Sequence, residues 1–286
     1  MEQDFNEIFK SEGIVHVKNL FSEDKIDSAV DAIERFKRNN LAFLKSNDLF
    51  VEEDRLHRVI NLHLHLQELK DLFVEGAEKI SDVVDSLGKA TLYTSIFFER
   101  GSQQPLHRDT PYFYTGKEIP DYMGFWAALE DVDESNGPLI AMKKSHLLGE
   151  PDLISLRNQY FKSQNVPPSH DGLFNSYNSE CLKMAESNGL VAEQFPMKKG
   201  DVIIWNASTL HGGAPQLDLS KTRKSFVMHI TPKNTPVKHM DYFFQQDKQR
   251  IPKADWNYLN YREREFVNTN VVDFMHKKQV KVQDLV

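Results

Sequence analysis

The chain contains the sequence QPLHRDT at residues 104–110, in which His107 and Asp109 stand two positions apart. The stretch follows a strand-like segment, and side chains at alternate positions of a strand point to the same face. An imidazole and a carboxylate could therefore reach one metal ion from here. Such a pair occurs by chance in many sequences, so its meaning depends on what the rest of the chain forms around it.

Short segments rich in β-branched and aromatic residues lie on both sides of this stretch, between turn signals. They are residues 91–98, 124–130, 139–142, 201–205 and 224–231. Many short strands with helices before them predict a β-sandwich or jelly roll supported by helices. We therefore expect a mainly β fold with one hydrophobic core and a single domain over residues 1–286.

This domain is expected to have three parts. Residues 1–90 should give mostly helical support, with amphipathic helices after Ser22 and from Leu66 to Leu87. Residues 91–232 should form the β core, interrupted by a polar insertion at 150–196 with a helix near residues 180–187. Residues 233–286 form a C-terminal extension whose charged pattern looks helical. Long insertions often cover binding sites.

Composition excludes several classes of function. The 286 residues carry a net charge of -7 and no stripe of lysine and arginine, which disfavours a nucleic-acid partner. Cys181 is the only cysteine, so a disulfide framework and a cysteine-rich zinc site are excluded and a reducing compartment is favoured. No signal-peptide core and no apolar run of about 18 residues is found. We expect a cytoplasmic protein with no membrane partner; nothing indicates its oligomeric state.

A second imidazole, His211, follows the expected strand 201–205 in the sequence TLHGG at residues 209–213. Glycines there permit close approach of the backbone. Two histidines and one carboxylate occupy one face of an octahedron and leave three positions open, as in non-haem Fe(II) oxygenases. A zinc site with three ligands would instead keep a single activated water.

Arg223 lies twelve positions after His211 and opens the expected strand 224–231. Its guanidinium fork could point into the same barrel mouth. There it would bind the far carboxylate of 2-oxoglutarate in a bidentate pair, while the 2-oxo acid end of that molecule chelates the iron. The combination of the three ligands with this arginine is much rarer than its parts.

The segment FWAALEDVDESNGPL at residues 125–139, followed by KSH at 144–146, resembles the core block of the phytanoyl-CoA dioxygenase-like family. With the motifs already quoted, the resemblance extends from Gly13 to about Pro232. It implies a double-stranded β-helix, a jelly roll of cupin-like type, to which the sequence pattern adds supporting N-terminal and C-terminal α-helices. It also implies an Fe(II)- and 2-oxoglutarate-dependent dioxygenase that uses O2 to hydroxylate an unactivated C–H bond of a small-molecule metabolite, releasing succinate and CO2.

Residue by residue, the resemblance implies that His107, Asp109 and His211 are the iron ligands and that Arg223 binds the co-substrate. Trp126 matches an aromatic residue commonly found beside the co-substrate. Asp109 also favours hydroxylation, because halogenating members of the superfamily have a small residue at that position.

One position departs from the family pattern. Members often have a serine two residues after the distal histidine, where this chain has Gly213. A contact to the co-substrate carboxylate is thereby missing, and we expect Tyr93 or Thr94, on the strand before the metal motif, to supply it.

Two other functions stay open at this point. A jelly-roll hydrolase or isomerase could use the same three ligands with zinc or manganese, and Arg223 would then bind a substrate anion. A non-catalytic barrel could bind a ligand without turnover. Other histidines are interpreted as structural: His63 and His65 on a strand surface, and His229 in the core or the barrel wall. The lack of a basic patch favours a small polar metabolite over a coenzyme A ester.

Overall fold

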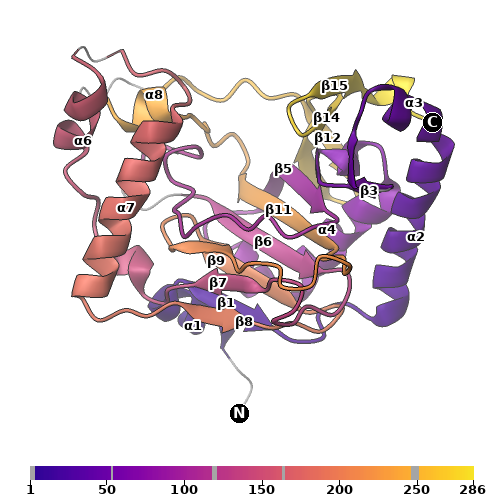
Figure 1. Ribbon diagram of the computed structural model, residues 1–286, viewed down its shortest axis with the longest axis horizontal. Helices are drawn as coiled ribbons and strands as arrows, with labels where there is room; N and C mark the ends of the chain where they lie inside the picture. Colours follow the sequence, from indigo (N-terminus) through magenta and orange to yellow (C-terminus); the bar gives the residue numbers. More distant parts are fainter. Residues whose placement is uncertain (1–3, 53, 118–120, 163–164, 246–250) are drawn as a thin grey trace.

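The computed structural model describes residues 4–52, 54–117, 121–162, 165–245 and 251–286. Two antiparallel-rich β-sheets form its centre, with α7 on one side and α2 on the other (Figure 1). The expected mainly β fold is confirmed, and all five segments expected as strands are strands, with ends that differ by one or two residues.

The large sheet has the strand order β1-β9-β6-β11-β5-β4-β14-β15, and β13 joins β5 in parallel while pairing with β12. Its strands are β1 Ile14–Val17, β4 Arg58–Ile60, β5 Ala90–Phe98, β6 Met123–Ala128, β9 Val202–Asn206, β11 Ser225–Pro232, β12 Tyr258–Tyr261, β13 Arg264–Val267, β14 Val271–Phe274 and β15 Lys278–Lys281. Strands far apart in sequence thus lie side by side.

A small sheet faces the large one and has the order β10-β7-β8. Its strands are β7 Leu139–Ala141, β8 Glu193–Phe195 and β10 His211–Gly213. Side chains of both sheets meet in one apolar cluster, in which Leu139 and Phe195 pack with Trp126 and Val227. A separate two-stranded hairpin consists of β2 Phe50–Glu52 and β3 Arg55–Leu56. The space between the two larger sheets is where the expected site residues point.

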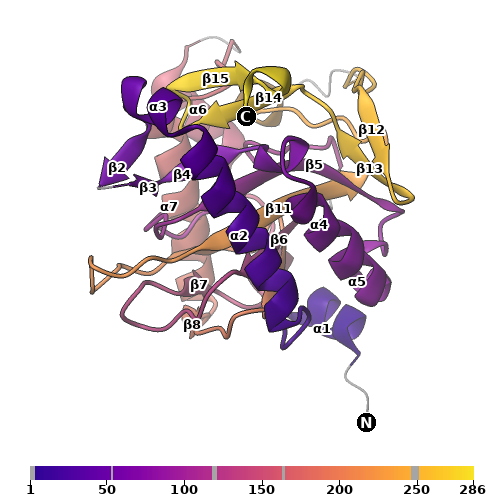
Figure 2. The same ribbon diagram turned by 90° about the vertical axis from the view of Figure 1, so that its right-hand side faces the viewer.

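N-terminal helices cover the outer face of the large sheet (Figure 2). They are α1 Phe5–Glu12, α2 Glu23–Asn39, α3 Leu41–Ser46, α4 Gln67–Lys79 and α5 Ser81–Val84. Ser22 caps α2 as expected, its hydroxyl accepting from the Lys25 amide at 3.3 Å. The helix expected from Leu66 to Leu87 is divided, because Ile80 leaves helical geometry with φ of -128°.

The expectation for residues 61–65 is wrong. They form no strand but a turn of 3-10 helix, η1 Leu62–Leu64, which begins after Asn61 in a left-handed conformation with φ of 61°. His63 is fully buried here, and its Nδ1 lies 2.7 Å from the Ser95 hydroxyl. The apolar alternation of this segment reflects burial on two sides of a turn and not a half-exposed strand.

The helical pattern expected after Pro232 is confirmed only in one short helix. After Pro232 the described residues contain one four-residue α-helix, α8 Met240–Phe243, a 3-10 turn at Val282–Asp284, and the strands β12 to β15. Two hairpins turn through residues with positive φ, Arg262 with Glu263 and Met275 with His276. Tight hairpin turns normally carry glycine or asparagine at such positions. Because these residues are missing here, the sequence gives no turn signal that would predict the strands.

The insertion between β7 and β8 contains two α-helices, α6 Leu153–Tyr160 and α7 Asp171–Ser187, together with the short 3-10 turn Ser145–Leu147 before it. Helix α7 begins nine residues before the expected position, where the His170 side chain accepts from the Leu173 amide at 3.1 Å. It packs on the C-terminal segment through Tyr177 and Phe243. None of the described helices is both long and apolar enough to cross a membrane.

Candidate metal centre and cofactor pocket

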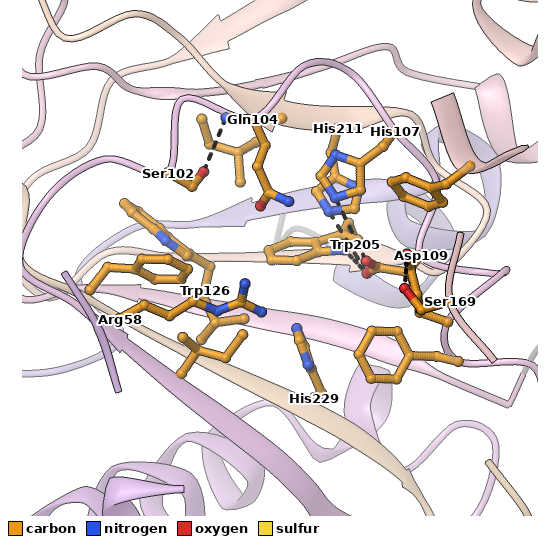
Figure 3. A pocket seen from close by; sticks show the side chains of 18 of the residues that line it. Arg58, Ser102, Gln104, His107, Asp109, Trp126, Ser169, Trp205, His211 and His229 are labelled. Carbon is orange, nitrogen blue, oxygen red and sulfur yellow. Dashed lines mark hydrogen bonds and ion pairs between the residues drawn. The ribbon is translucent and has the colours of Figure 1, made fainter. Parts of the chain in front are cut away.

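The three predicted metal ligands come together at one end of the space between the sheets (Figure 3). Each offers one ligand atom, and these atoms all lie within 4.8 Å of one another. His107 and His211 form an antiparallel bridge, with N–O distances of 2.8 and 3.0 Å. Asp109 lies in the bend after this bridge, where its amide donates to the Ala207 carbonyl at 2.9 Å. The cluster could therefore hold a metal ion.

Both imidazoles are oriented by their own backbone. The Nδ1 of His107 lies 2.8 Å from the Pro105 carbonyl, and that of His211 lies 3.0 Å from the Thr209 carbonyl. A carbonyl only accepts hydrogen bonds, so each Nδ1 carries the proton and each Nε2 keeps a lone pair for a metal. Burial lowers the pKa of His211 to about 4, which keeps this ring neutral at pH 7.

The carboxylate of Asp109 is held by Trp205, whose indole Nε1 donates to Oδ2 at 3.0 Å. Oδ1 lies 3.9 Å from His107 Nε2, and Oδ2 lies 3.7 Å from His211 Nε2. Burial acts to raise the pKa of Asp109, but the neighbouring histidines and the indole bond outweigh it and lower the pKa. No spacing in the sequence links Trp205 to Asp109, so this contact could not be predicted from the sequence.

The loop that carries the motif is fastened by Arg108. Its guanidinium is buried and donates to the carbonyls of Ser145, Leu148 and Gly149 at 2.6 to 3.1 Å. Its backbone amide donates to Asn178 of α7 at 2.9 Å. The insertion helix thus supports the metal motif from behind as well as bordering the site.

A cavity of about 590 Å³ opens beside the three ligands. It is lined by apolar and aromatic side chains with several polar groups among them, including Arg58, Ser102, Gln104, Trp126, Phe174, Arg223 and His229. A cavity of this kind next to a metal cluster is the usual form of a site for small organic molecules.

Arg223 and Trp126 lie together in this cavity, as predicted. The guanidinium carbon of Arg223 is 5.5 Å from the centre of the Trp126 ring, and NH1 donates to the Gly137 carbonyl at 3.3 Å. Nε is buried with no hydrogen-bond partner among the described residues. Burial lowers the pKa of Arg223 to about 10, so it stays charged at neutral pH. A buried cation with unused donors is suited to bind a carboxylate.

Of the other residues predicted to lie near the co-substrate, Gly213 is close to Ser102, whereas Tyr93 and Thr94 lie outside the metal cavity. Gly213 lies against Ser102, since a Cβ at this glycine would be 3.0 Å from the Ser102 hydroxyl oxygen. Tyr93 and Thr94 do not line the metal cavity but a second, adjoining cavity of about 230 Å³. There Tyr93 packs on Trp256, and the Thr94 hydroxyl donates to Asn61 at 2.8 Å. The hydroxyl next to Gly213 is therefore that of Ser102.

Sequence reasoning missed several residues that line the metal cavity. Arg58 belongs to β4, a short strand placed among the N-terminal support, and His276 comes from the unexpected C-terminal hairpin. His229 was expected in the core or the barrel wall and lies on the inner wall. No local spacing marks such residues, because strand pairing alone brings them to the site.

The fold of the chain is similar to that of several proteins of known structure. Among solved structures, the chain is similar to the non-haem α-ketoglutarate-dependent carbocyclase SnoK from nogalamycin biosynthesis, with a TM-score of 0.56, 14% identity, and coverage of 83% of this chain and 87% of that chain. It is also similar to HygX from Streptomyces hygroscopicus, determined with nickel and 2-oxoglutarate bound, with a TM-score of 0.54, 13% identity, and coverage of 82% and 88%. AviO1 from Streptomyces viridochromogenes Tue57 gives a TM-score of 0.53, 21% identity, and coverage of 82% and 96%.

These structural similarities show the fold alone, and they confirm the cupin-like jelly roll. No curated protein matches the sequence. The family model of phytanoyl-CoA dioxygenase matches residues 9–224, well over half of the chain, and spans the three metal-binding candidates and Arg223. The chain therefore belongs to the phytanoyl-CoA dioxygenase family.

Proposed function

We propose that the chain is an Fe(II)- and 2-oxoglutarate-dependent dioxygenase that hydroxylates an unactivated C–H bond of a small-molecule metabolite and releases succinate and CO2. The observation that carries the proposal is the buried guanidinium of Arg223, with an unpartnered Nε, in the same cavity as two histidines and one carboxylate. A site for a bidentate dicarboxylate needs both features at once.

The residues present fit Fe(II). Two neutral imidazoles with free Nε2 lone pairs and one carboxylate form a mixed nitrogen and oxygen set that leaves further positions open. Iron bound here would supply the activation of oxygen. The chain's own contribution is to hold His107, His211 and Asp109 in place through the Pro105 and Thr209 carbonyls and the Trp205 indole.

The co-substrate position follows from Arg223. Its fork would bind the far carboxylate of 2-oxoglutarate, with the Trp126 ring beside it and the Ser102 hydroxyl near Gly213. The aromatic side chains of Tyr112, Phe113 and Phe174 line the same cavity, and they would limit the access of water to a bound substrate. A substrate held among them would have its reacting carbon near the metal.

The solved structures of this fold include a carbocyclase and an epimerase as well as a monooxygenase. Asp109 favours hydroxylation over halogenation, because it fills with a carboxylate the ligand position that a halide would need. Hydroxylation is proposed here over cyclisation and epimerisation because it is the usual outcome that the family resemblance implies. The arrangement is less suited to the hydrolase alternative, which requires one activated water and has no use for a buried arginine beside Trp126. A small-molecule partner belongs to the same proposal, and a cytoplasmic location stays a prediction.

The proposal is tested by oxygen-dependent formation of succinate. The purified chain is incubated with excess Fe(II), ascorbate and 2-oxoglutarate, in air and under strict anaerobiosis, and succinate is quantified. We expect succinate in air only, and none from the His211→Ala variant. If a substrate is instead converted in a metal-dependent reaction that continues without oxygen, the hydrolase or isomerase alternative would be favoured.

A further inference from the structure

A second arginine points into the metal cavity and has no partner of its own. Arg58, on β4, lines the cavity, and its Nε is buried without a hydrogen bond. Within the part of the chain that the structure describes, its guanidinium makes no hydrogen bond or ion pair. The pKa of Arg58 is lowered by burial, and Asp273 is the acid that opposes this.

Asp273 does not satisfy this charge directly. Its carboxylate accepts from the His276 amide at 2.7 Å and from the Gln279 side chain at 2.9 Å, within its own hairpin. Arg58 as a whole is only partly buried, but its Nε is shielded from water and has no hydrogen-bond partner among the described residues. A buried donor without a partner is costly, and an anion that entered the cavity would supply this missing hydrogen bond.

Arg58 occupies a different place in the pocket from Arg223. It lines both the metal cavity and the adjoining cavity, together with Ile96, Phe113, His229 and His276, whereas Arg223 and the metal ligands line only the first. Figure 3 shows the Arg58 side chain reaching into the cavity on the side of His229. His229 has a buried Nδ1 that also lacks a partner. An anion bound where the two cavities meet would lie beside the co-substrate position at Arg223 and would not overlap with it.

Electrostatics support a monoanion. Besides the ligand Asp109, the one carboxylate among the described residues lining the metal cavity is that of Asp171, which is exposed at the start of α7. The pKa of His57, which precedes Arg58 in the chain, is lowered by burial and by the charges of Arg58, Arg100 and Arg223. A divalent metal, Asp109, Arg223 and a dicarboxylate co-substrate would balance one another. The charge of Arg58 would then be opposed only by the exposed Asp171 and by Asp273, and neither carboxylate makes an ion pair with it among the described residues.

We propose that Arg58 binds a carboxylate of the primary substrate, and that His229 adds a hydrogen bond to the same group. The substrate class is thus a small organic acid whose carboxylate lies at the junction of the two cavities. Its carbon skeleton extends toward the metal ligands in one direction, or along Tyr93 and Trp256 in the other. This inference rests on the proposed function, because the co-substrate must occupy Arg223.

The test compares a carboxylate with its neutral analogue of the same shape. Benzoate and benzamide are titrated by calorimetry into the full chain, kept anaerobic with Fe(II) and saturating 2-oxoglutarate. We expect wild type to bind benzoate at least tenfold more tightly than benzamide, and Arg58→Gln to lose this preference. Arg58→Lys should keep part of it. Arg35→Gln, which removes an exposed arginine paired with Glu68, should keep all of it.

Two results would overturn the inference. One is a wild type without preference for benzoate, including no binding of either probe. The other is an Arg58→Gln variant that keeps the preference or loses its affinity for 2-oxoglutarate by tenfold or more, which would assign Arg58 to the co-substrate. Failure of the proposed function can be distinguished from failure of this inference by visible absorption. If the proposed function is wrong, wild type with Fe(II) and 2-oxoglutarate will show no charge-transfer band.

Discussion

At the scale of single residues, the site depends on groups that orient the ligands without touching the metal. Trp205 is the clearest, because its indole is the one side-chain donor to Asp109 among the described residues. Such supporting contacts typically change metal affinity by tenfold to a hundredfold. They cannot be found from spacing, since Trp205 and Asp109 are brought together by the bridge between His107 and His211 and by the hydrogen bond from the Asp109 amide to the Ala207 carbonyl.

Replacing Trp205 with Phe should weaken metal binding while leaving the fold intact. The ring is kept, but the hydrogen bond to Asp109 is lost, so the carboxylate becomes free to rotate. We expect the affinity for Co(II), measured by its visible absorption, to fall about tenfold or more. Trp126→Phe is the matched control, because Trp126 lies beside Arg223 and makes no contact with Asp109. Equal affinities in wild type and Trp205→Phe would contradict this role.

Arg223→Gln should raise the dissociation constant for 2-oxoglutarate by about tenfold to a hundredfold, since a charge-assisted pair is worth roughly 1.5–3 kcal/mol. Binding is measured anaerobically with Fe(II) present. Arg223→Lys should recover little, because an ammonium cannot make the bidentate contact. Unchanged affinity in the glutamine variant would remove Arg223 from the co-substrate site.

At the scale of elements, the central strands could be predicted because their apolar and β-branched residues are bounded by clear turn signals. The strands β12 to β15 could not, because their hairpins turn through Arg262, Glu263, Met275 and His276 with positive φ and without glycine. The three metal-binding candidates and Arg223 could be predicted from the sequence, because their spacing and the family resemblance indicate them, and the structure places all four beside one cavity. Arg58, Ser102 and His276 reach the cavity through pairings between distant segments, which no local pattern encodes.

The packing of β6 on β9 gives a prediction at this scale. Gly124 is paired with Trp205, and a Cβ at Gly124 would lie 2.1 Å from the indole Cε2. Gly124→Ala should therefore displace the indole and destabilise the fold by about 1–3 kcal/mol, with a loss of metal affinity. Gly149→Ala is the control, because its Cβ would meet nothing within 4 Å. Urea unfolding and Co(II) titration check both effects, and equal behaviour of the two variants would contradict the close packing.

At the scale of the whole molecule, the part of the chain that matches the family model supplies the metal-binding candidates, and the strands after it supply further residues that line the cavities. The match ends at residue 224, whereas Trp256, Val267, Thr269 and His276 line the adjoining cavity. The metal centre thus lies in the part of the chain shared with the family. The segment that follows supplies one wall of the space where, on our inference, the substrate is selected.

The stability of the whole molecule should depend on pH through His63. Burial, with a smaller effect of the Lys70 charge, lowers the pKa of His63 to about 3 from an ordinary value of 6.5. The unfolded chain then binds the proton more readily, so His63 contributes no penalty above pH 6.5, and stability is lost as the pH falls from 6.5 toward 3. Between pH 7 and 5 the loss from this residue is about 2 kcal/mol.

His63→Gln keeps a polar side chain near Ser95 but cannot be protonated. The free energy of unfolding, measured in urea at pH 7 and pH 5, should fall less in the variant than in wild type. Other buried histidines, such as His211 and His229, are present in both proteins and cancel in the difference. Parallel pH dependences would show that His63 is not the group responsible.

On the proposed function, His107, Asp109 and His211 hold Fe(II) together with 2-oxoglutarate in the cavity beside Arg223. This arrangement can be examined by anaerobic titration followed by visible absorption. We predict a charge-transfer band that develops only when both Fe(II) and 2-oxoglutarate are present, and that is absent in His107→Ala. Fe(II) that binds without any spectral response to 2-oxoglutarate, or an equal band in His107→Ala, would contradict the account.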